Sequence, residues 1–220
     1  LFVKPDVFMT NRSKESYEKH GGFLPIFEKE NAFDYVDRYD KVAVIDADVW
    51  IRPGSPSIFK QLDTTFGAVL ERDLPITDDY KRKIANYTKM QYGSPSIAPL
   101  FNWRAGVGAD FYNMGVMVFD NGLADYLRGQ TPRQFLDRPE FKQFVDGVGP
   151  WKWSTDQTLL NYWIKKEKMA ITNIDWRFNS LYSAIPKDKI TQAHFVHFFL
   201  KDKLPDRGED VERLKKDVER

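Results

Sequence analysis

The chain has 220 residues, of which 42% are hydrophobic and 30% charged, with 17 Phe, 10 Tyr and 6 Trp. This composition is typical of a globular domain with a buried core, and it excludes disordered and fibrous proteins. The 33 Lys and Arg residues against 32 Asp and Glu residues leave a net charge of +1, which argues against nucleic acid as the main partner. The absence of cysteine excludes a disulfide scaffold, a zinc ribbon and thiol catalysis.

The organisation of the chain indicates one unit. No apolar run approaches the roughly 18 to 20 residues of a membrane span, and the N-terminus lacks a signal-peptide profile. We therefore expect a soluble protein without a membrane span, and a cytoplasmic location is favoured. No repeat or low-complexity segment appears, so residues 1–220 are predicted to form a single domain. The chain opens on Leu1 rather than Met, which fits a piece of a longer protein.

The first half of the chain predicts alternating helices and strands. Residues 31–40 have the spacing of a short helix, and residues 41–45 (KVAVI) are typical of a buried strand that ends abruptly in acidic residues. Residues 58–62 follow a turn and predict a helix start. Residues 66–70 (FGAVL) predict a second buried strand. The alternation favours an α/β domain.

The pattern then changes. Residues 77–110 are polar and aromatic and too long for an ordinary connection, so we expect a functional lid there, on the acceptor side of the site. Residues 112–119 (YNMGVMVF) predict an apolar strand, and residues 156–166 have helical spacing. Residues 194–200 predict a late strand. Residues 209–220 predict an amphipathic closing helix, with Val211, Leu214 and Val218 on one stripe.

Two carboxylates stand where the first buried strand ends. Asp46 and Asp48 form a D-x-D triplet around Ala47, and oxygen ligands of this kind suit Mn²⁺ or Mg²⁺ carrying a diphosphate. The spacing alone carries little weight, because 22 aspartates in 220 residues supply about two such triplets by chance. The position at the carboxyl end of a strand favours a ligand site. The alternative is that both aspartates merely cap a turn before Pro53.

Four further segments accompany this one in a fixed order. The five segments are 39–49 (YDKVAVIDADV), 112–117 (YNMGVM), 154–161 (STDQTLLN), 175–179 (DWRFN) and 197–203 (HFFLKDK). In this order they resemble the conserved segments of the GT-A nucleotide-sugar glycosyltransferases, in particular glycosyltransferase family 8 and its glycogenin-like members. The resemblance spans about 80% of the chain, from Lys29 to Lys203. It departs from the family at Leu200, which replaces a glycine, and in the absence of a proline directly after Lys203.

The resemblance implies a GT-A fold, with a mixed, mainly parallel sheet flanked by helices, and it implies roles for particular residues. The metal site would consist of Asp46, Asp48 and His197. The nucleotide-sugar donor would contact the D-x-D triplet and several other residues: Asp46, Ala47, Asp48, Lys29, Asn113, Gly115 and Lys203. Asp156 would bind hydroxyls of the donor sugar, and Gln157 would lie on the face of its anomeric carbon. Residues 1–28 do not match, so the part that holds the uracil base is not recognisable.

Each of these residues also has an ordinary structural explanation. His194 and His197 point to opposite faces if they share a strand, so at most one readily enters the site, and the distance to Lys203 favours His197. Lys203 could equally be solvated surface in its charged run. Lys29 lies 17 residues before Asp46, one more than the family spacing, and could be an exposed lysine at a helix start.

Three further candidate site residues also have both a structural and a functional explanation. Gly115 could permit a bulge or tight packing within its strand, while the Asn113 amide could bond a substrate hydroxyl. Asp156 could be an ordinary N-terminal cap of its helix. The resemblance favours the functional alternative for Asn113 and Asp156.

These observations predict a metal-dependent hexosyltransferase. The donor would be a UDP-sugar of the UDP-glucose or UDP-galactose type, and the acceptor a hydroxyl of a carbohydrate or protein-glycan. An inverting enzyme needs a carboxylate base, whereas Gln157 is an uncharged amide, so transfer with retention is favoured, with the leaving phosphate taking the acceptor proton. The alternatives are a catalytically inactive GT-A-like carbohydrate-binding or assembly module and, more weakly, a metal-dependent phosphohydrolase.

Overall fold

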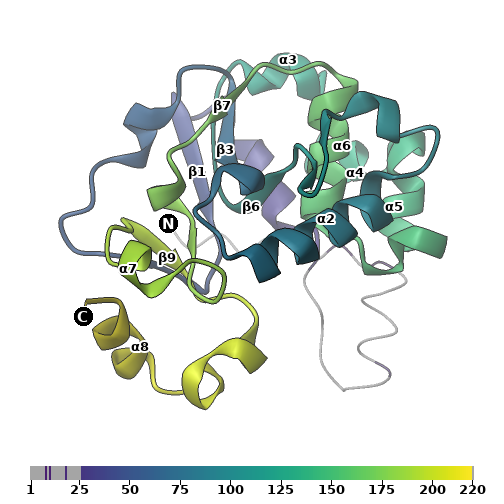
Figure 1. The fold of residues 1–220 in the computed structure, drawn as a ribbon. Coiled ribbons are helices and arrows are strands. Elements are labelled where there is room, and N and C mark those ends of the chain that lie inside the picture. Colours follow the sequence, from purple (N-terminus) through teal and green to yellow (C-terminus); the bar gives the residue numbers. More distant parts are fainter. Residues whose placement is uncertain (1–7, 9, 11–17, 19–25, 220) are drawn as a thin grey trace.

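The computed structural model describes residues 8, 10, 18 and 26–219 (Figure 1). The strands are β1 Lys41–Ile45, β2 Val49–Ile51, β3 Phe66–Leu70, β4 Trp103–Arg104, β5 Gly108–Ala109, β6 Tyr112–Asp120, β7 Ile171–Asn173, β8 Ser180–Leu181 and β9 Phe195–His197. The α-helices are α2 Asp78–Tyr92, α3 Leu123–Leu127, α4 Pro132–Leu136, α5 Lys142–Asp146, α6 Asp156–Lys166, α7 Lys187–Ile190 and α8 Val211–Glu219. The 3₁₀ helices are η1 Glu28–Tyr35, η2 Ile58–Gln61, η3 Glu71–Asp73, η4 Ala98–Leu100, η5 Pro139–Phe141, η6 Gly149–Trp153, η7 Trp176–Phe178, η8 Lys201–Lys203 and η9 Pro205–Gly208.

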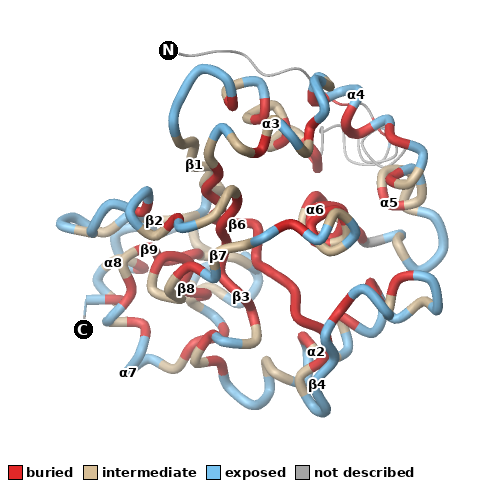
Figure 2. The backbone as a smooth tube through the Cα atoms, turned by 90° about the horizontal axis from the view of Figure 1, so that it is seen from above, coloured by how far each residue is buried: buried red, intermediate tan, exposed pale blue. Residues whose placement is uncertain are grey.

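The central sheet has the strand order β1-β6-β3-β7. Strand β6 is antiparallel to both β1 and β3, whereas β7 is parallel to β3. The expected mixed sheet is therefore confirmed, and β1, β3 and β7 run in the same direction. Because β6 lies between β1 and β3, however, the parallel neighbours within this sheet are β3 and β7 alone. Figure 2 shows β6 as a buried strand in the middle of the molecule.

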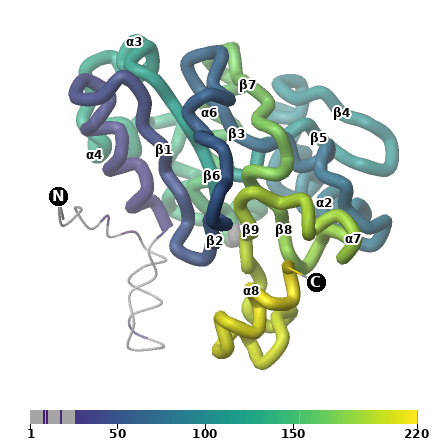
Figure 3. Tube along the Cα trace, turned by 90° about the vertical axis from the view of Figure 1, so that its left-hand side faces the viewer, coloured from purple at the N-terminus to yellow at the C-terminus, as the bar shows by residue number. Residues whose placement is uncertain are grey.

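Two groups of elements flank this sheet. Helices α4, α5 and α6 lie together on one side of it, and α7, α8 and β9 lie on the other (Figure 1). A second sheet has the order β2-β9-β8, with β2 antiparallel and β8 parallel to β9. Figure 3 shows β2 following β1 along the chain and running beside β9. The turn between β1 and β2 therefore joins the two sheets.

An aromatic cluster ties the helical side to the sheet. Phe33, Phe135 and Trp163 are at most 2% exposed and come from η1, α4 and α6. Their ring centroids are 5.3 Å apart for Phe33 and Phe135 and 4.6 Å apart for Phe135 and Trp163, in edge-to-face contacts. Phe33 also contacts Phe119 of β6 at 5.6 Å. Rings in this arrangement contribute packing energy beyond the area they bury.

The strongest local patterns of the sequence are confirmed. Strands over 41–45 and 66–70 and the helix over 156–166 form with the predicted bounds, and the strand over 112–119 extends by one residue to Asp120. The predicted closing helix forms as α8. Its Leu214 and Val218 are buried, whereas Val211 is 49% exposed and lies off the packed stripe. In the described part of the chain, no helix is both long enough and apolar enough to cross a membrane.

Three expected segments differ from the structure. Residues 77–110 contain the 15-residue helix α2, which the Thr77 hydroxyl caps by accepting from the Tyr80 N–H at 3.3 Å. The helical pattern is obscured because α2 has many charged and polar residues, and even its buried side chains include the polar Thr88 and Gln91. The expected helix over 31–40 is instead the 3₁₀ segment η1, which starts and ends earlier. The late strand is limited to Phe195–His197, because the backbone turns into the left-handed region at Leu200.

The side chain of Asn161 fastens α6 to the start of β6. Its amide oxygen accepts from the Tyr112 N–H at 2.7 Å, and its amide nitrogen donates to the Tyr112 and Gln157 carbonyls, both at 2.8 Å. Asn161 thus supplies the backbone partners that a further strand would otherwise provide. The two bonds to Tyr112 are buried, and the bond to Gln157 is partly buried.

We expect Asn161→Ala to lower the free energy of unfolding by about 3 kcal/mol, because it removes the hydrogen-bond acceptor of the buried Tyr112 N–H and the donor to the Tyr112 carbonyl. Urea unfolding measures the effect. The matched control is Asn121→Ala at an exposed turn, which should change stability by less than about 0.5 kcal/mol. Equal effects of the two substitutions would contradict the role of Asn161.

Candidate functional site

The D-x-D residues occupy the turn between β1 and β2, and hydrogen bonds fix its backbone. The Asp46 N–H donates to the Gly115 carbonyl of β6 at 2.8 Å, and the Asp46 carbonyl accepts from the Val49 N–H at 3.1 Å. The Asp48 carbonyl accepts from the Phe198 N–H, just after β9, at 2.9 Å. Hydrogen bonds to both sheets therefore fix the backbone of the turn that carries the two carboxylates.

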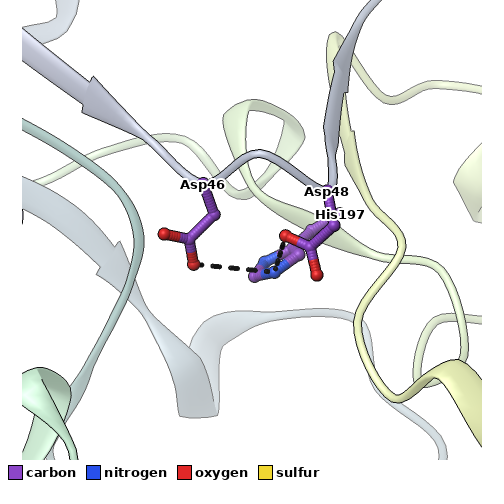
Figure 4. Close-up of side chains that lie close together, drawn as sticks. All are labelled: Asp46, Asp48 and His197. Atoms are coloured by element: carbon purple, nitrogen blue, oxygen red, sulfur yellow. Dashed lines mark ion pairs between the residues drawn. The ribbon is translucent and has the colours of Figure 1, made fainter. Parts of the chain in front are cut away.

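His197 completes a group of three with these carboxylates (Figure 4). It ends β9 and pairs with Val49, and its Nε2 lies 3.2 Å from Asp48 Oδ1 and 3.9 Å from Asp46 Oδ2. One ligand atom from each residue lies within 4.8 Å of the other two. Of the two candidate histidines in the described part of the chain, His197 reaches the carboxylates. The ring of His194 lies instead against Phe178, at 5.0 Å.

A chain of amides orients the His197 ring. Its Nδ1 lies 3.0 Å from Asn179 Oδ1, and the Asn179 amide nitrogen donates to Asn113 Oδ1 at 2.8 Å. This second bond assigns the orientation of the Asn179 amide, so that its oxygen accepts from the protonated Nδ1 of His197. Nε2 then faces the carboxylates and would offer its lone pair to a cation held between them, which is the arrangement of a metal-ligating histidine with its supporting partner. Two carboxylates and one imidazole therefore fit Mn²⁺ or Mg²⁺.

The two carboxylates differ electrostatically. The hydrogen bond from His197 lowers the pKa of Asp48 below its usual range. Burial raises the pKa of Asp46, although the Lys29 ammonium opposes this effect. The charge of Lys29 thus keeps the more buried carboxyl closer to its ionised state.

Lys29 lies inside the site and not on an exposed helix start. Its Nζ is 3.0 Å from Asp46 Oδ1 and 2.6 Å from Asp156 Oδ2, and it donates to the Met114 carbonyl at 3.0 Å. Burial by itself lowers the pKa of Lys29, but the charges of Asp156 and Asp46 outweigh it and hold the pKa above its ordinary value. One ammonium group therefore bridges the turn after β1 and the start of α6.

A bulge in β6 turns backbone groups toward the site. Ala68 of β3 pairs with Met117, but the next residue, Val69, pairs with Asn113, so residues 114–116 leave the ladder with β3. The Gly115 N–H donates to Asn113 Oδ1 at 2.9 Å, and the Met114 N–H donates to Gln157 Oε1 at 3.1 Å. The bulge that the sequence offered as the alternative for Gly115 exists, and it belongs to the site itself.

Helix α6 presents its first two residues to the same place. Thr155 is the N-cap residue, so Asp156 is the first residue of the helix, and its carboxylate is ion-paired with Lys29. The Gln157 oxygen is engaged by Met114, and a hydrogen bond also joins its side chain to Tyr87. Burial raises the pKa of Tyr87 to about 12, so Tyr87 stays a neutral phenol.

Glu71 is a site residue that the sequence analysis did not identify. It is 3% exposed, accepts from the Tyr80 hydroxyl at 3.1 Å, and has the Asn113 amide nitrogen at 3.5 Å. Burial raises the pKa of Glu71 to about 7, although both hydrogen bonds oppose the shift. The signal that could have found it is its position, directly after the buried strand over 66–70, as Asp46 directly follows the strand over 41–45.

These residues enclose a cavity of about 470 Å³. One part of its lining is charged or hydrogen-bonding, and another is apolar or aromatic. The lining residues are Lys29, Asp46, Glu71, Tyr80, Lys83, Ile84, Tyr87, Phe111, Asn113, Met114, Gly115, Thr155, Asp156, Gln157, His197, Phe199 and Leu200. Ala47, Asp48 and Lys203 are exposed and do not line it. Lys203 lies on η8, so its contact with a diphosphate stays a prediction.

The pKa of Glu71 makes stability depend on pH. A carboxyl whose pKa is raised by folding stabilises the fold fully below its ordinary pKa of 4.5, and this stability is lost as the pH rises through about 7. We expect Glu71→Gln to remove this dependence. From about pH 5 to about pH 8, the free energy of unfolding of the wild type should then fall by about 3 kcal/mol relative to that of Glu71→Gln. Urea unfolding across this range, without added metal, measures it. Parallel pH curves for wild type and Glu71→Gln would contradict the expectation, and exposed Glu209→Gln serves as the control.

Gly115 leaves room for His197. A Cβ at this position would lie 2.4 Å from His197 Cε1 and 2.6 Å from Nδ1, closer than packed atoms tolerate. We expect Gly115→Ala to displace the imidazole and weaken Mn²⁺ binding at least about ten-fold, as measured by calorimetry on folded protein. Gly129→Ala controls for general destabilisation, because Gly129 has a φ of +70° and an added Cβ there meets nothing within 4 Å. Unchanged Mn²⁺ affinity in Gly115→Ala would refute this expectation.

The comparisons with known proteins concern the fold. No protein-family model and no curated protein matches the sequence. Among solved structures, the galactosyltransferase LgtC, in complex with donor and acceptor sugar analogs, has 17% sequence identity and a TM-score of 0.52 over 93% of this chain and 71% of its own. Two further structures are more distant. Mouse xyloside xylosyltransferase 1 has 14% sequence identity and a TM-score of 0.46, over 81% of this chain and 64% of its own. The bifunctional glycosyltransferase WbbM has 12% sequence identity and a TM-score of 0.43, over 90% of this chain and 36% of its own. Together with the mixed sheet, the likeness to LgtC shows that this chain has the GT-A fold of glycosyltransferases.

Proposed function

We propose that this protein is a metal-dependent glycosyltransferase that moves a hexose from a UDP-sugar, of the UDP-glucose or UDP-galactose type, to a hydroxyl of a carbohydrate or protein-glycan. The observation that carries the proposal is the Asp46, Asp48 and His197 group at one end of a cavity in a GT-A fold. The order of the five sequence segments supports the donor class. The LgtC structure, which holds donor and acceptor sugar analogs, offers a precedent for such ligands on this fold.

Different residues of the site would bind the metal ion and the donor sugar. Asp46, Asp48 and His197 would hold Mn²⁺ or Mg²⁺, which when bound supplies positive charge to the donor diphosphate. Asp156 would bind a hydroxyl of the donor sugar, and the Lys29 ammonium, 2.6 Å away, holds its carboxylate in place. The Asn113 amide is fixed by Asn179 and Gly115 and would stand beside the sugar. Apart from Asp48 and Asn179, these residues line the cavity, whose wall includes the first residues of α6.

In the transfer that we propose, the bond between the anomeric carbon and the β-phosphate oxygen breaks, and the acceptor oxygen bonds to that carbon on the same face. The acceptor proton passes to the leaving phosphate oxygen. The Gln157 oxygen is engaged by the Met114 N–H, so the side chain presents a fixed, uncharged amide to the cavity. This arrangement favours retention, because the side chain at the reactive face lacks a basic carboxylate.

The test has two stages. In the first, UDP is titrated by calorimetry into wild-type protein with Mn²⁺ and then with excess chelator. We expect binding only with the metal, and we expect Asp48→Asn to weaken it at least about ten-fold because a ligand is lost. Asp125→Asn, at an exposed position of α3, should bind as wild type does. Absence of UDP binding to the wild type with Mn²⁺ would overturn the proposal.

The second stage separates an enzyme from an inactive module. UDP-glucose and UDP-galactose are incubated with protein and Mn²⁺, and the first anomer of the released sugar is identified by NMR. Hydrolysis that yields the α-anomer from these α-linked donors supports a retaining transferase. Release of the β-anomer would contradict retention and point to the Glu71 carboxylate as a base. Binding without any hydrolysis would favour a carbohydrate-binding module with the same fold.

A further inference from the structure

Leu200 has an unusual backbone conformation for a leucine in a cavity wall. Its φ and ψ are 60° and 70°, in the left-handed region that favours glycine. Of the five non-glycine residues with positive φ in the described part of the chain, Leu200 alone lines the cavity; the others are charged, namely Arg128, Lys168, Asp206 and Arg207. Strain of this kind persists where the surrounding structure holds the residue in place.

The surrounding backbone holds Leu200 from both sides. Before it, the His197 carbonyl accepts from the Tyr182 N–H at 3.0 Å, and the Phe198 N–H donates to the Asp48 carbonyl at 2.9 Å. After it, the Leu200 carbonyl accepts from the Lys203 N–H at 2.7 Å. The turn that carries Leu200 is thus fastened to the turn that carries the metal group. The backbone of Leu200 is therefore held at a defined place, from which its side chain lines the cavity.

Leu200 lies at the open edge of an apolar wall. Phe199 contacts the His197 ring at 5.6 Å and the Tyr80 ring at 5.9 Å, and Tyr80 in turn donates to Glu71. Leu200 extends this wall toward solvent, since it lines the cavity and yet is 53% exposed. Its methyl groups occupy space that a glycine would leave open, and they offer no hydrogen bond to a ligand.

The cavity beside Leu200 is the part that would hold the sugar. Asp46 and His197 line the cavity, whereas Asp48 does not, so the metal group stands at one end of it. The rest of the cavity leads to Asp156, Gln157 and Glu71, which offer hydrogen-bonding groups. Leu200 lines the same cavity, so a sugar attached to a metal-bound diphosphate and directed inward would share this space with the leucine side chain.

Building on the proposed function, we propose that Leu200 is a specificity-determining residue that limits the size of the donor sugar. A hexose bearing only hydroxyl groups fits beside the leucine. A larger polar substituent, such as an N-acetyl group, is excluded, because the leucine takes its space and would remove water from its amide without replacing the hydrogen bonds.

The test measures binding, so it does not depend on turnover. UDP, UDP-glucose and UDP-N-acetylglucosamine are titrated by calorimetry in the presence of Mn²⁺ into wild type, Leu200→Ala and Leu200→Gly. We expect wild type to bind UDP-glucose at least about ten-fold more tightly than UDP-N-acetylglucosamine, a ratio typical of a steric mismatch in a pocket. Both substitutions should reduce this ratio at least about five-fold while changing the UDP affinity less than about three-fold. Leu100→Ala, at a partly exposed leucine outside the cavity lining, is the matched control and should keep the wild-type ratio.

The outcomes separate this inference from the function on which it rests. Failure of UDP to bind the wild type overturns the proposed function and the role of Leu200 with it. UDP binding with an unchanged ratio in Leu200→Ala and Leu200→Gly leaves the function standing and overturns the role of Leu200. A ratio that falls in Leu200→Gly but not in Leu200→Ala also overturns it. Alanine already removes most of the side-chain volume, so such a result would trace the change to the backbone freedom of glycine.

Discussion

The departure of residues 114–116 from the β3 ladder is the constraint on which the rest of the site depends. A regular β6 would direct its backbone groups to neighbouring strands and leave none for the cavity. The bulge instead leaves the Met114 carbonyl to accept from Lys29 and the Met114 N–H to donate to Gln157, while on the other edge of β6 the Gly115 carbonyl continues the β1 ladder to the Asp46 N–H. Bulges beside active sites commonly re-aim groups in this way. The irregularity on one edge of β6 thus positions the lysine and the start of α6, and the regular ladder on its other edge positions the D-x-D turn.

The charge balance of the site follows from this arrangement. Asp46 and Asp156 share one ammonium group, and Asp48 has the imidazole of His197 as its partner. Close by, burial raises the pKa of Glu30 well above its ordinary value, and the charge of Asp156 adds to this effect. Neither carboxylate oxygen of Glu30 has a hydrogen-bond partner. Carboxyl groups therefore outnumber the cationic group among them, an environment that attracts a cation and favours the neutral form of the most buried acids.

Much of the fold and part of the site could be predicted from the sequence, where the signal is local. Residues 41–45 and 66–70 are continuous apolar runs with abrupt ends, and α6 has a clear helical period, so their bounds were correct. Helix α2 is rich in charged and polar residues, which is why the sequence predicts a lid over 77–110 rather than a helix, although Tyr80, Ile84 and Tyr87 of this helix line the cavity. The grouping of Asp46 and Asp48 with His197 followed from a resemblance in the order of segments. Lys203 was placed by the same argument, but it lies exposed outside the cavity.

The supporting residues were harder to predict because their roles arise from contacts between distant segments. Asn179 acts on His197 through a hydrogen bond across 18 residues, and Asn113 reaches Asn179 across 66. No period or local composition encodes such a bond. Glu71 is different, since a carboxylate directly after a buried strand is visible in the sequence.

The turn between β1 and β2 has a mechanical consequence. Asp46 follows a strand of the central sheet, whereas Asp48 precedes β2 and His197 ends β9, both in the second sheet. A cation held by all three side chains would act as a cross-link between two separately hydrogen-bonded units. Local opening that moves β9 away from the central sheet would then have to release the ion, so its free-energy cost would rise with ion concentration by linkage. The free energy of local opening at β9 would therefore depend on whether the site holds an ion.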